Sequence, residues 1–398
     1  MASARPNRRA DDGGGNDADA AGDATATEPE TEDRATQDLL RALAARDELG
    51  VRRALAAGAD AAYQDEATGQ SALMAAARDG LADAVSVLLQ AGAPWNAVDR
   101  SGRCAGDLAL AGNHQTVVET LVSAGVAAEL VFAMVTRNTP VSAPRNAEYL
   151  AGRATYENEG RTLLQAGTAD AVMMEWERPL MCAHARALLP HPGGRVLNVG
   201  FGLGIIDGCL QELQPSQHTI VEAHPDVLAR MREQGWFDKP NVRVVRGRWQ
   251  DAHLESLGPF DGVFFDTFGE FLDDLREFHE LLPRLLSPSG LYSFFNGMAP
   301  NSFFFQGVVA EVVRLELKKL GLDLEFVRLE VDAGDDDVWR GVARRYFSSN
   351  DYYLPLARRD PAALGAAAAT AWTRAERRRP ADVAFGESAD SAAASRAR

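Results

Sequence analysis

The chain has 398 residues, 46% of them hydrophobic, which is enough for two domains with buried cores. Its formal net charge of −16 excludes general affinity for nucleic acid, because the phosphates would repel the protein. An acidic surface suits cationic partners such as arginine-rich peptides, although solubility alone explains it equally well. Cys104, Cys182 and Cys209 are scattered, which predicts a reducing compartment with neither a disulfide framework nor a zinc site. No segment resembles a membrane span or a signal peptide, so we expect a soluble protein of the cytoplasm and nucleus.

Both ends of the chain have compositions typical of disorder. Residues 1–34 are rich in Asp, Glu, Ala, Gly and Thr, with no large apolar residue after Met1, and residues 361–398 are rich in alanine. Such segments bury too little apolar surface to offset the entropy lost on ordering. We therefore predict disordered ends around two domains, residues 35–130 and 131–360.

Residues 35–130 contain an internal repeat with a period near 33 residues. The segment Ser71–Ala93 aligns at this offset with Cys104–Val126. Paired short helices with this period resemble the ankyrin repeat, with Ser71-Ala-Leu-Met where the family has Thr-Pro-Leu-His. A preceding helix over Leu39–Gly58 is predicted to cap the stack. A stack this small is expected to lean on the next domain, either as a helical cap or as a surface for a partner.

The second half of the chain alternates between strand and helix patterns. A helix is expected to begin near Arg178, because Pro179 is tolerated only in its first turn. The predicted strands are 195–199, 218–223, 242–247, 260–266 and 290–296, and the predicted helices are 204–213, 225–234, 273–286 and 307–321. Two strands with a short connection, 324–331 and 346–357, close the domain. This order predicts an α/β fold, a doubly wound sheet with an antiparallel edge.

A glycine-rich turn follows the first of these strands. It contains Gly200, Gly202 and Gly204, and the next strand ends in Glu222. Such a turn lets a ligand approach bare backbone, and a carboxylate at the end of the next strand holds both hydroxyls of a ribose. Dinucleotide-binding proteins and S-adenosylmethionine (SAM) methyltransferases share this arrangement. The turn lacks the GxGxxG spacing that holds a pyrophosphate, which favours SAM.

Six segments, EWERPLM, VLNVGFGLGIID, EAHP, GRWQD, FDGVFFDTFGE and SFFNG, together resemble the fungal-type (type IV) protein arginine N5-methyltransferases. That family couples degenerate ankyrin repeats to a domain similar to guanidinoacetate N-methyltransferase, and the likeness covers roughly residues 36–358. It implies a class I SAM-dependent methyltransferase fold. It also implies direct in-line methyl transfer from SAM to the δ nitrogen of an arginine in a protein, with a ribosomal protein as the expected substrate. The glutamate pair and Thr-His-Trp loop of the ω-type arginine methyltransferases are not found in the sequence.

The resemblance also assigns residues to the site. Glu177 and Asp266 would be the catalytic carboxylates, which orient a guanidinium and accept its departing proton. Glu222 would hold the ribose, while Arg248 and Trp249 would border the adenine. The residues implied for SAM binding are Tyr156, Met173, Met181, Phe201, Gly202, Leu203, Gly204, Ile205, Ile206, Asp207, Glu222, Ala223, His224, Arg248, Trp249 and Asp266. No metal is implied.

Each assignment also has a purely structural explanation. Glu177 fits the N-terminus of a helix and Asp266 the end of a strand, while methionines and Trp249 are common core residues. Glu270 is a weaker candidate for facing the substrate. Two other functions remain open: a methyltransferase for small guanidines, and an ankyrin scaffold whose methyltransferase half is vestigial. The presence of Gly200, Gly202, Glu222 and Asp266 together argues against the scaffold.

Overall fold

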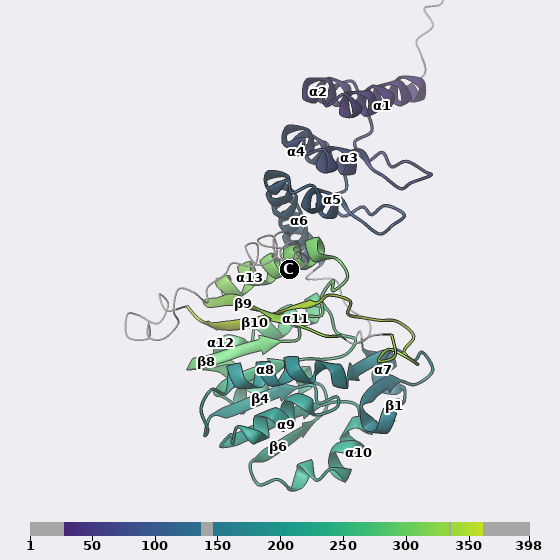
Figure 1. The fold of residues 1–398 in the computed structure, drawn as a ribbon. Helices are drawn as coiled ribbons and strands as arrows, with labels where there is room; N and C mark the ends of the chain where they lie inside the picture. Colours follow the sequence, from purple (N-terminus) through teal and green to yellow (C-terminus); the bar gives the residue numbers. More distant parts are fainter. Residues whose placement is uncertain (1–27, 137–145, 334–335, 361–398) are drawn as a thin grey trace, which may run out of the picture.

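The computed structural model describes residues 28–136, 146–333 and 336–360, so most of both predicted disordered ends lies outside the described residues. A stack of helices stands at one end of an α/β domain (Figure 1). The first helix, α1 (Glu28–Ala44), begins inside the segment predicted to be disordered. The domain boundary at residue 35 is therefore too late for this helix.

The stack consists of helix pairs, as the repeat predicts. Its members are α1, α2 (Glu48–Ala56), α3 (Ala72–Arg78), α4 (Ala82–Gln90), α5 (Ala105–Ala111) and α6 (Gln115–Thr136). The single helix predicted over Leu39–Gly58 is wrong, because Asp47 starts a new helix and its side chain accepts a hydrogen bond from Gly50 N at 2.9 Å. Ser71 caps α3 in the same way, accepting from Met74 N at 3.1 Å.

Helix α6 corrects the expectation about membrane spans. It has 22 residues and a mean hydropathy of 1.8 over 18 of them, so it is long and apolar enough to cross a bilayer. One such helix is weak evidence by itself, because core helices pass the same test. The N-terminal half of α6 is buried at Val118 and Leu121, whereas Phe132 and Met134 near its end are exposed.

The α/β domain is built on a seven-stranded sheet in the order β6-β5-β4-β7-β8-β10-β9. The strands are β4 (Arg195–Val199), β5 (Gln217–Glu222), β6 (Val242–Arg246), β7 (Phe260–Phe265), β8 (Leu286–Phe294), β9 (Leu322–Glu330) and β10 (Asp351–Arg359). The first five are parallel, and β10 is antiparallel to both β8 and β9. The predicted sheet with an antiparallel edge is confirmed. However, β10 begins at Asp351 rather than Tyr346, so the β9–β10 connection is long.

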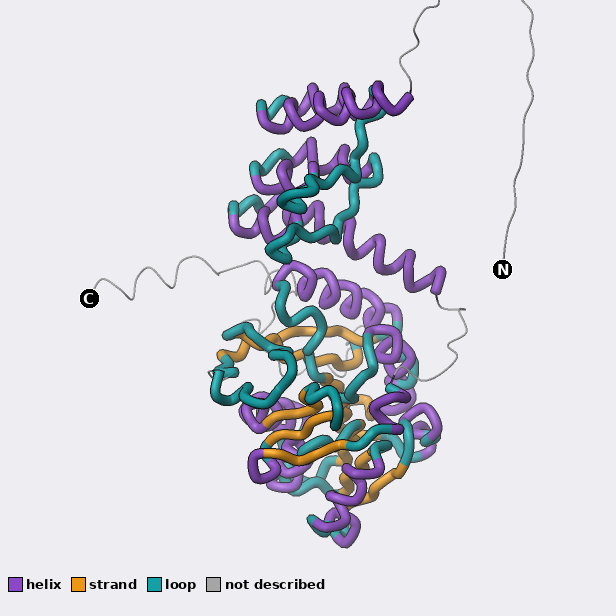
Figure 2. The backbone as a smooth tube through the Cα atoms, turned by 90° about the vertical axis from the view of Figure 1, so that its right-hand side faces the viewer, coloured by secondary structure: helices purple, strands orange, loops and turns teal. Residues whose placement is uncertain are grey.

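Helices cover both faces of this sheet (Figures 1 and 2). One face packs against α8 (Arg178–Leu188), α9 (Ile205–Glu212) and α10 (Pro225–Glu233), and the other against α11 (Leu272–His279), α12 (Leu282–Leu285) and α13 (Phe303–Lys319). Helix α8 begins at Arg178 with Pro179 in its first turn, as predicted. The helix predicted over 273–286 is divided instead, because Pro283 is accommodated only at the start of the new helix α12.

A small second sheet lies ahead of α8 and was not predicted. It is the antiparallel set β1 (Ala154–Glu157), β2 (Thr162–Gln165) and β3 (Ala171–Met174), preceded by the short helix α7 (Ala147–Ala151). The turn Glu175–Glu177 connects β3 to α8. This sheet therefore positions the segment that carries Glu177.

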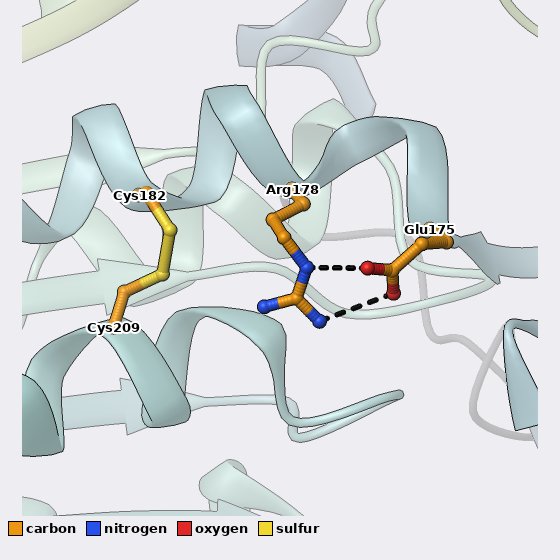
Figure 3. The surroundings of a disulfide bond; sticks show 4 residues. All are labelled: Glu175, Arg178, Cys182 and Cys209. Carbon is orange, nitrogen blue, oxygen red and sulfur yellow. Dashed lines mark hydrogen bonds and ion pairs between the residues drawn. A yellow bond between two sulfur atoms is a disulfide. The ribbon is translucent and has the colours of Figure 1, made fainter.

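The expectation of no disulfide is wrong. Figure 3 shows Cys182 on α8 bonded to Cys209 on the neighbouring helix α9, close to the ion pair of Glu175 with Arg178. The two Cα atoms are 5.3 Å apart, within the range that disulfides span. Cysteine spacing along the chain gave no signal, because the packing of α8 on α9 brings the two residues together. Cys104 is free and buried.

The repeats and the α/β domain share a hydrophobic core. Phe304, Val308 and Val312 of α13 are at most 1% exposed and belong to the same cluster as the ankyrin helices. A methyl group on Gly106 of α5 would approach the Phe304 ring to 2.1 Å, so only glycine fits there. The stack packs against the second domain, as predicted.

Candidate active site at the carboxyl ends of the parallel strands

A cavity of about 690 Å³, counting the part open to solvent, lies at the carboxyl ends of β4, β5 and β7. Ligands of doubly wound sheets bind at this edge. The residues predicted for SAM that line it are Met173, Phe201, Gly202, Ile206, Glu222, Ala223, Arg248, Trp249 and Asp266. The cavity therefore brings together most segments of the predicted site.

The glycine-rich turn forms one wall of the cavity. Gly200 and Gly202 have φ values of +97° and +57°, in the region that favours glycine. A Cβ on Gly200 would lie 1.8 Å from the carbonyl oxygen of Asp266. Glycine at this position lets the end of β4 pass directly beside the end of β7, which places Asp266 at the turn.

Glu222 joins this turn to the end of β5. Its carboxylate is 8% exposed and accepts hydrogen bonds from the backbone nitrogens of Phe201 at 2.9 Å, Ala223 at 2.7 Å and His224 at 2.6 Å. Burial raises the pKa of Glu222, and these backbone bonds oppose that rise. The carboxylate is thus held rigidly at the cavity wall.

Glu270 organises the other end of the cavity. Its carboxylate accepts hydrogen bonds from Trp249 Nε1 at 2.8 Å, Gln250 Nε2 at 2.9 Å and Thr267 Oγ1 at 2.7 Å. Both oxygens are engaged in these bonds, and Glu270 also lines the cavity, so the suggestion that it faces the substrate stays a prediction. Its geometry fits a different role, holding Trp249 and the loop after β6 in place.

The two predicted catalytic carboxylates interact electrostatically, although Asp266 lines the cavity and Glu177 does not. Burial raises the pKa of Glu177 to about 7, although hydrogen bonds from Tyr346 and from the backbone of Met174 oppose this. Burial and the neighbouring Glu177 together raise the pKa of Asp266 well above its usual value. Among the described residues, no basic side chain forms an ion pair with either carboxylate. A buried acid beside a half-buried one, with no cation paired to either, forms a site suited to a cationic group.

Comparison with known proteins places the chain in a family. The guanidinoacetate N-methyltransferase family matches residues 142–300, and ankyrin repeats in three copies match residues 39–130. "Protein arginine N-methyltransferase 2" of Cryptococcus neoformans is 35% identical over 334 residues, which cover 76% of this chain and 90% of that protein. The chain belongs to the protein arginine N-methyltransferase 2 family.

Other fungal members agree with this assignment. The Saccharomyces cerevisiae protein of the same name is 32% identical over 318 residues, covering 69% of this chain and 76% of its own length. The Yarrowia lipolytica protein is 43% identical over 221 residues, covering 52% of this chain and 46% of its own length. The predicted resemblance, including its combination of repeats and methyltransferase domain, is confirmed.

Some of the residues predicted to bind SAM do not line the cavity. They are Tyr156, Met181, Leu203, Gly204, Ile205, Asp207 and His224. Asp207 is fully buried, and Asn198 Nδ2 donates to both of its carboxylate oxygens at 2.9 Å. His224 Nε2 lies 3.1 Å from the backbone oxygen of Tyr149. Ile205 and Asp207 are buried because the helical period of α9 turns every third or fourth residue into the core.

Sequence reasoning also missed part of the lining. Asn146, Tyr149 and Leu150 at helix α7 close one side, and Thr267 and Phe268 follow Asp266. The last two lie within the segment FDGVFFDTFGE, so its likeness to the family could have indicated them. Helix α7 has only five residues, and no pattern in the sequence marks it.

Proposed function

We propose that this protein transfers a methyl group from SAM to the δ nitrogen of an arginine in a protein substrate. The observation that carries the proposal is the pair Glu177 and Asp266: Glu177 is buried, Asp266 is half-buried and lines the cavity, and the charge of Glu177 acts on Asp266. Membership of the protein arginine N-methyltransferase 2 family supports the acceptor. The choice of the δ nitrogen rests on the resemblance to the N5-specific enzymes.

The residues present fit SAM. Gly200 and Gly202 leave bare backbone at one wall, Glu222 lies where a ribose carboxylate is expected, and Trp249 offers a flat apolar side chain for adenine. SAM, when bound, supplies an electrophilic methyl group on its sulfonium sulfur. Because Asp266 follows β7 directly beside Gly200 and lines the cavity, it belongs both to this cofactor site and to the catalytic pair.

Glu177 and Asp266 are suited to bind and orient a guanidinium. The guanidinium is a poor nucleophile, since its charge is delocalised and its pKa lies above 12. Two carboxylates against its nitrogens balance this charge and fix its plane, which relieves the repulsion between the two acids. The δ nitrogen would take the methyl group as the bond from the methyl carbon to the sulfonium sulfur breaks and leaves a neutral thioether, and a carboxylate oxygen of the pair would accept the proton of that nitrogen.

We propose that the substrate is a basic ribosomal protein. We also propose that this protein acts in the cytoplasm and nucleus. The net charge of −16 supports a basic partner, because opposite charges steer association. We further propose that the ankyrin repeats contact this partner. A small guanidine is the second candidate acceptor, supported by the family match over residues 142–300.

The test is an incubation of the purified protein with labelled SAM and isolated ribosomal proteins, with guanidinoacetate in a parallel reaction. Acid hydrolysis and chromatography then separate δ-methylarginine from the ω forms. We expect label in δ-methylarginine of one protein band, absent for Glu177→Gln. Label only in the ω forms would disprove the N5 assignment, and label only in guanidinoacetate would favour the small-molecule enzyme.

A further inference from the structure

The described part of the connection between β9 and β10, residues 331–333 and 336–350, folds back toward the candidate active site. Its two ends are joined by a hydrogen bond from Val331 N to Asn350 O at 2.8 Å. In between, Ala343 N donates to Ala169 O, ahead of β3, at 2.9 Å. The described part of this connection is thereby fastened to the small sheet that leads into Glu177.

Aromatic packing holds Tyr346 of this connection in place. Its ring centroid lies 4.9 Å from that of Trp339 and 5.8 Å from that of Trp176. Phe347 packs on Trp176 as well, with centroids 5.4 Å apart. Because Trp176 directly precedes Glu177, this cluster fixes the Tyr346 ring relative to the catalytic carboxylate.

The Tyr346 hydroxyl donates a hydrogen bond to Oε1 of Glu177. The backbone nitrogen of Met174 donates to the same oxygen at 2.9 Å. No described residue donates a hydrogen bond to Oε2. The two oxygens therefore differ, one doubly engaged by the protein and the other with its lone pairs available to a ligand.

We propose that Tyr346 is a positioning residue, whose hydroxyl holds Oε1 of Glu177 so that Oε2 faces the arginine guanidinium. The proposal rests on the proposed function. Burial, with the charge of Glu177, raises the pKa of Tyr346 well above its usual value, so the phenol keeps its proton and acts as a donor throughout the working pH range. Its hydrogen bond also opposes the raised pKa of Glu177, which keeps more of that carboxylate ionised near neutral pH.

The test compares Tyr346→Phe with Tyr292→Phe. Both variants delete one buried hydroxyl and keep the ring, but the Tyr292 hydroxyl lies 3.1 Å from His279 Nε2, in the core on the other face of the sheet. For Tyr346→Phe we expect kcat/KM for an arginine peptide at pH 7 to fall at least tenfold, with SAM affinity within twofold of wild type. The acidic limb of its pH profile should move up by about one pH unit, the scale of one hydrogen bond to a charged group. Tyr292→Phe should leave both quantities unchanged.

A binding measurement separates this proposal from the proposed reaction. Calorimetric titration of an arginine peptide into the protein with S-adenosylhomocysteine should show the same upward shift in the pH dependence of affinity. In a Glu177→Gln background, Tyr346→Phe should have little further effect on peptide affinity, because the two residues act through one contact. If the acidic limb of the pH dependence does not move, Tyr346 only stabilises the fold. The same conclusion follows if Tyr346→Phe lowers peptide affinity equally in the wild-type and Glu177→Gln backgrounds. If the wild-type protein places the label from SAM in ω-methylarginine, the proposed function is refuted, but the peptide-binding test of Tyr346 still applies.

Discussion

The carboxylate of Glu177 raises the pKa of Asp266, although one residue precedes helix α8 and the other follows strand β7. Two coupled acids titrate as a pair, so their behaviour is shared between them. A guanidinium bound as we propose would remove the repulsion and lower both pKa values. Under this proposal, the charge of the substrate and the protonation of the two acids are linked.

Replacing either acid with its amide should abolish most activity. Glu177→Gln and Asp266→Asn keep size but remove the charge that pairs with the guanidinium, so we expect turnover to fall by at least two orders of magnitude. SAM affinity should change little for Glu177→Gln and more for Asp266→Asn, which lines the cofactor cavity. Single-turnover assays and calorimetry measure the two effects. Arginine methylation at nearly the normal rate by Glu177→Gln would leave Glu177 with only a structural role.

The activity of the wild-type protein should rise with pH through neutrality. Glu177, with a pKa of about 7, must be ionised to pair with the substrate cation. On this basis kcat/KM at pH 6 should be about tenfold below its value at pH 8. A profile of initial rates at low substrate concentration measures this limb. A flat profile from pH 6 to 8 would show that Glu177 is already ionised below pH 6.

The same raised pKa makes stability depend on pH. Because the folded pKa of Glu177 exceeds its unfolded value, the stabilising contribution is complete below the unfolded pKa of 4.5 and is lost as pH rises through about 7. Glu177→Gln lacks this loss, so at pH 8 it should be more stable than wild type by on the order of 1–3 kcal/mol, with no such gain near pH 4.5. Urea unfolding without ligands measures the difference. Glu175→Gln, which removes a partly exposed acid paired with Arg178, is the control and should show no gain.

Glu222 is expected to serve both the cofactor and the fold. In Glu222→Gln, the side-chain NH2 group replaces one carboxylate oxygen and faces a backbone N–H donor, either that of Phe201 or that of Ala223, so a hydrogen bond is lost. The substitution also removes the charge offered to the ribose. We expect SAM to bind at least tenfold more weakly, together with a lower melting temperature. Glu233→Gln, on the exposed side of α10, should change neither. Unchanged SAM affinity in calorimetry would remove Glu222 from the cofactor site.

The junction between the repeats and the α/β domain should be essential for stability. Phe304→Ala empties a fully buried site between α13 and the repeats, so we expect a loss of about 3–5 kcal/mol with SAM affinity largely retained. A chain that begins at Asn146 should aggregate, because it exposes Phe304, Val308 and Val312. Replacing these three with polar residues should restore its solubility. If the shortened chain is folded but fails to bind SAM, the repeats contribute to the cofactor site.

Part of the lining of the candidate site could be predicted because its signals are local. The turn around Gly200 needs glycine for its own backbone conformation, and Glu222 directly ends the following strand. Tyr346 lacked such a signal, and it was assigned to a strand that in fact begins at Asp351. Glu270 was visible as an acid, but its partner Trp249 comes from another loop. The contacts of these residues join segments far apart in the chain.

The sequence by itself determined the alternation of strands and helices, since buried parallel strands form continuous apolar runs and helices repeat with their own period. It also determined the repeat and the family likeness of the motifs. Only the tertiary structure decided that Cys182 meets Cys209, that α13 completes the ankyrin core, and that Tyr346 holds one oxygen of Glu177. These depend on how whole elements pack, and packing brings together side chains whose positions in the chain carry no common pattern.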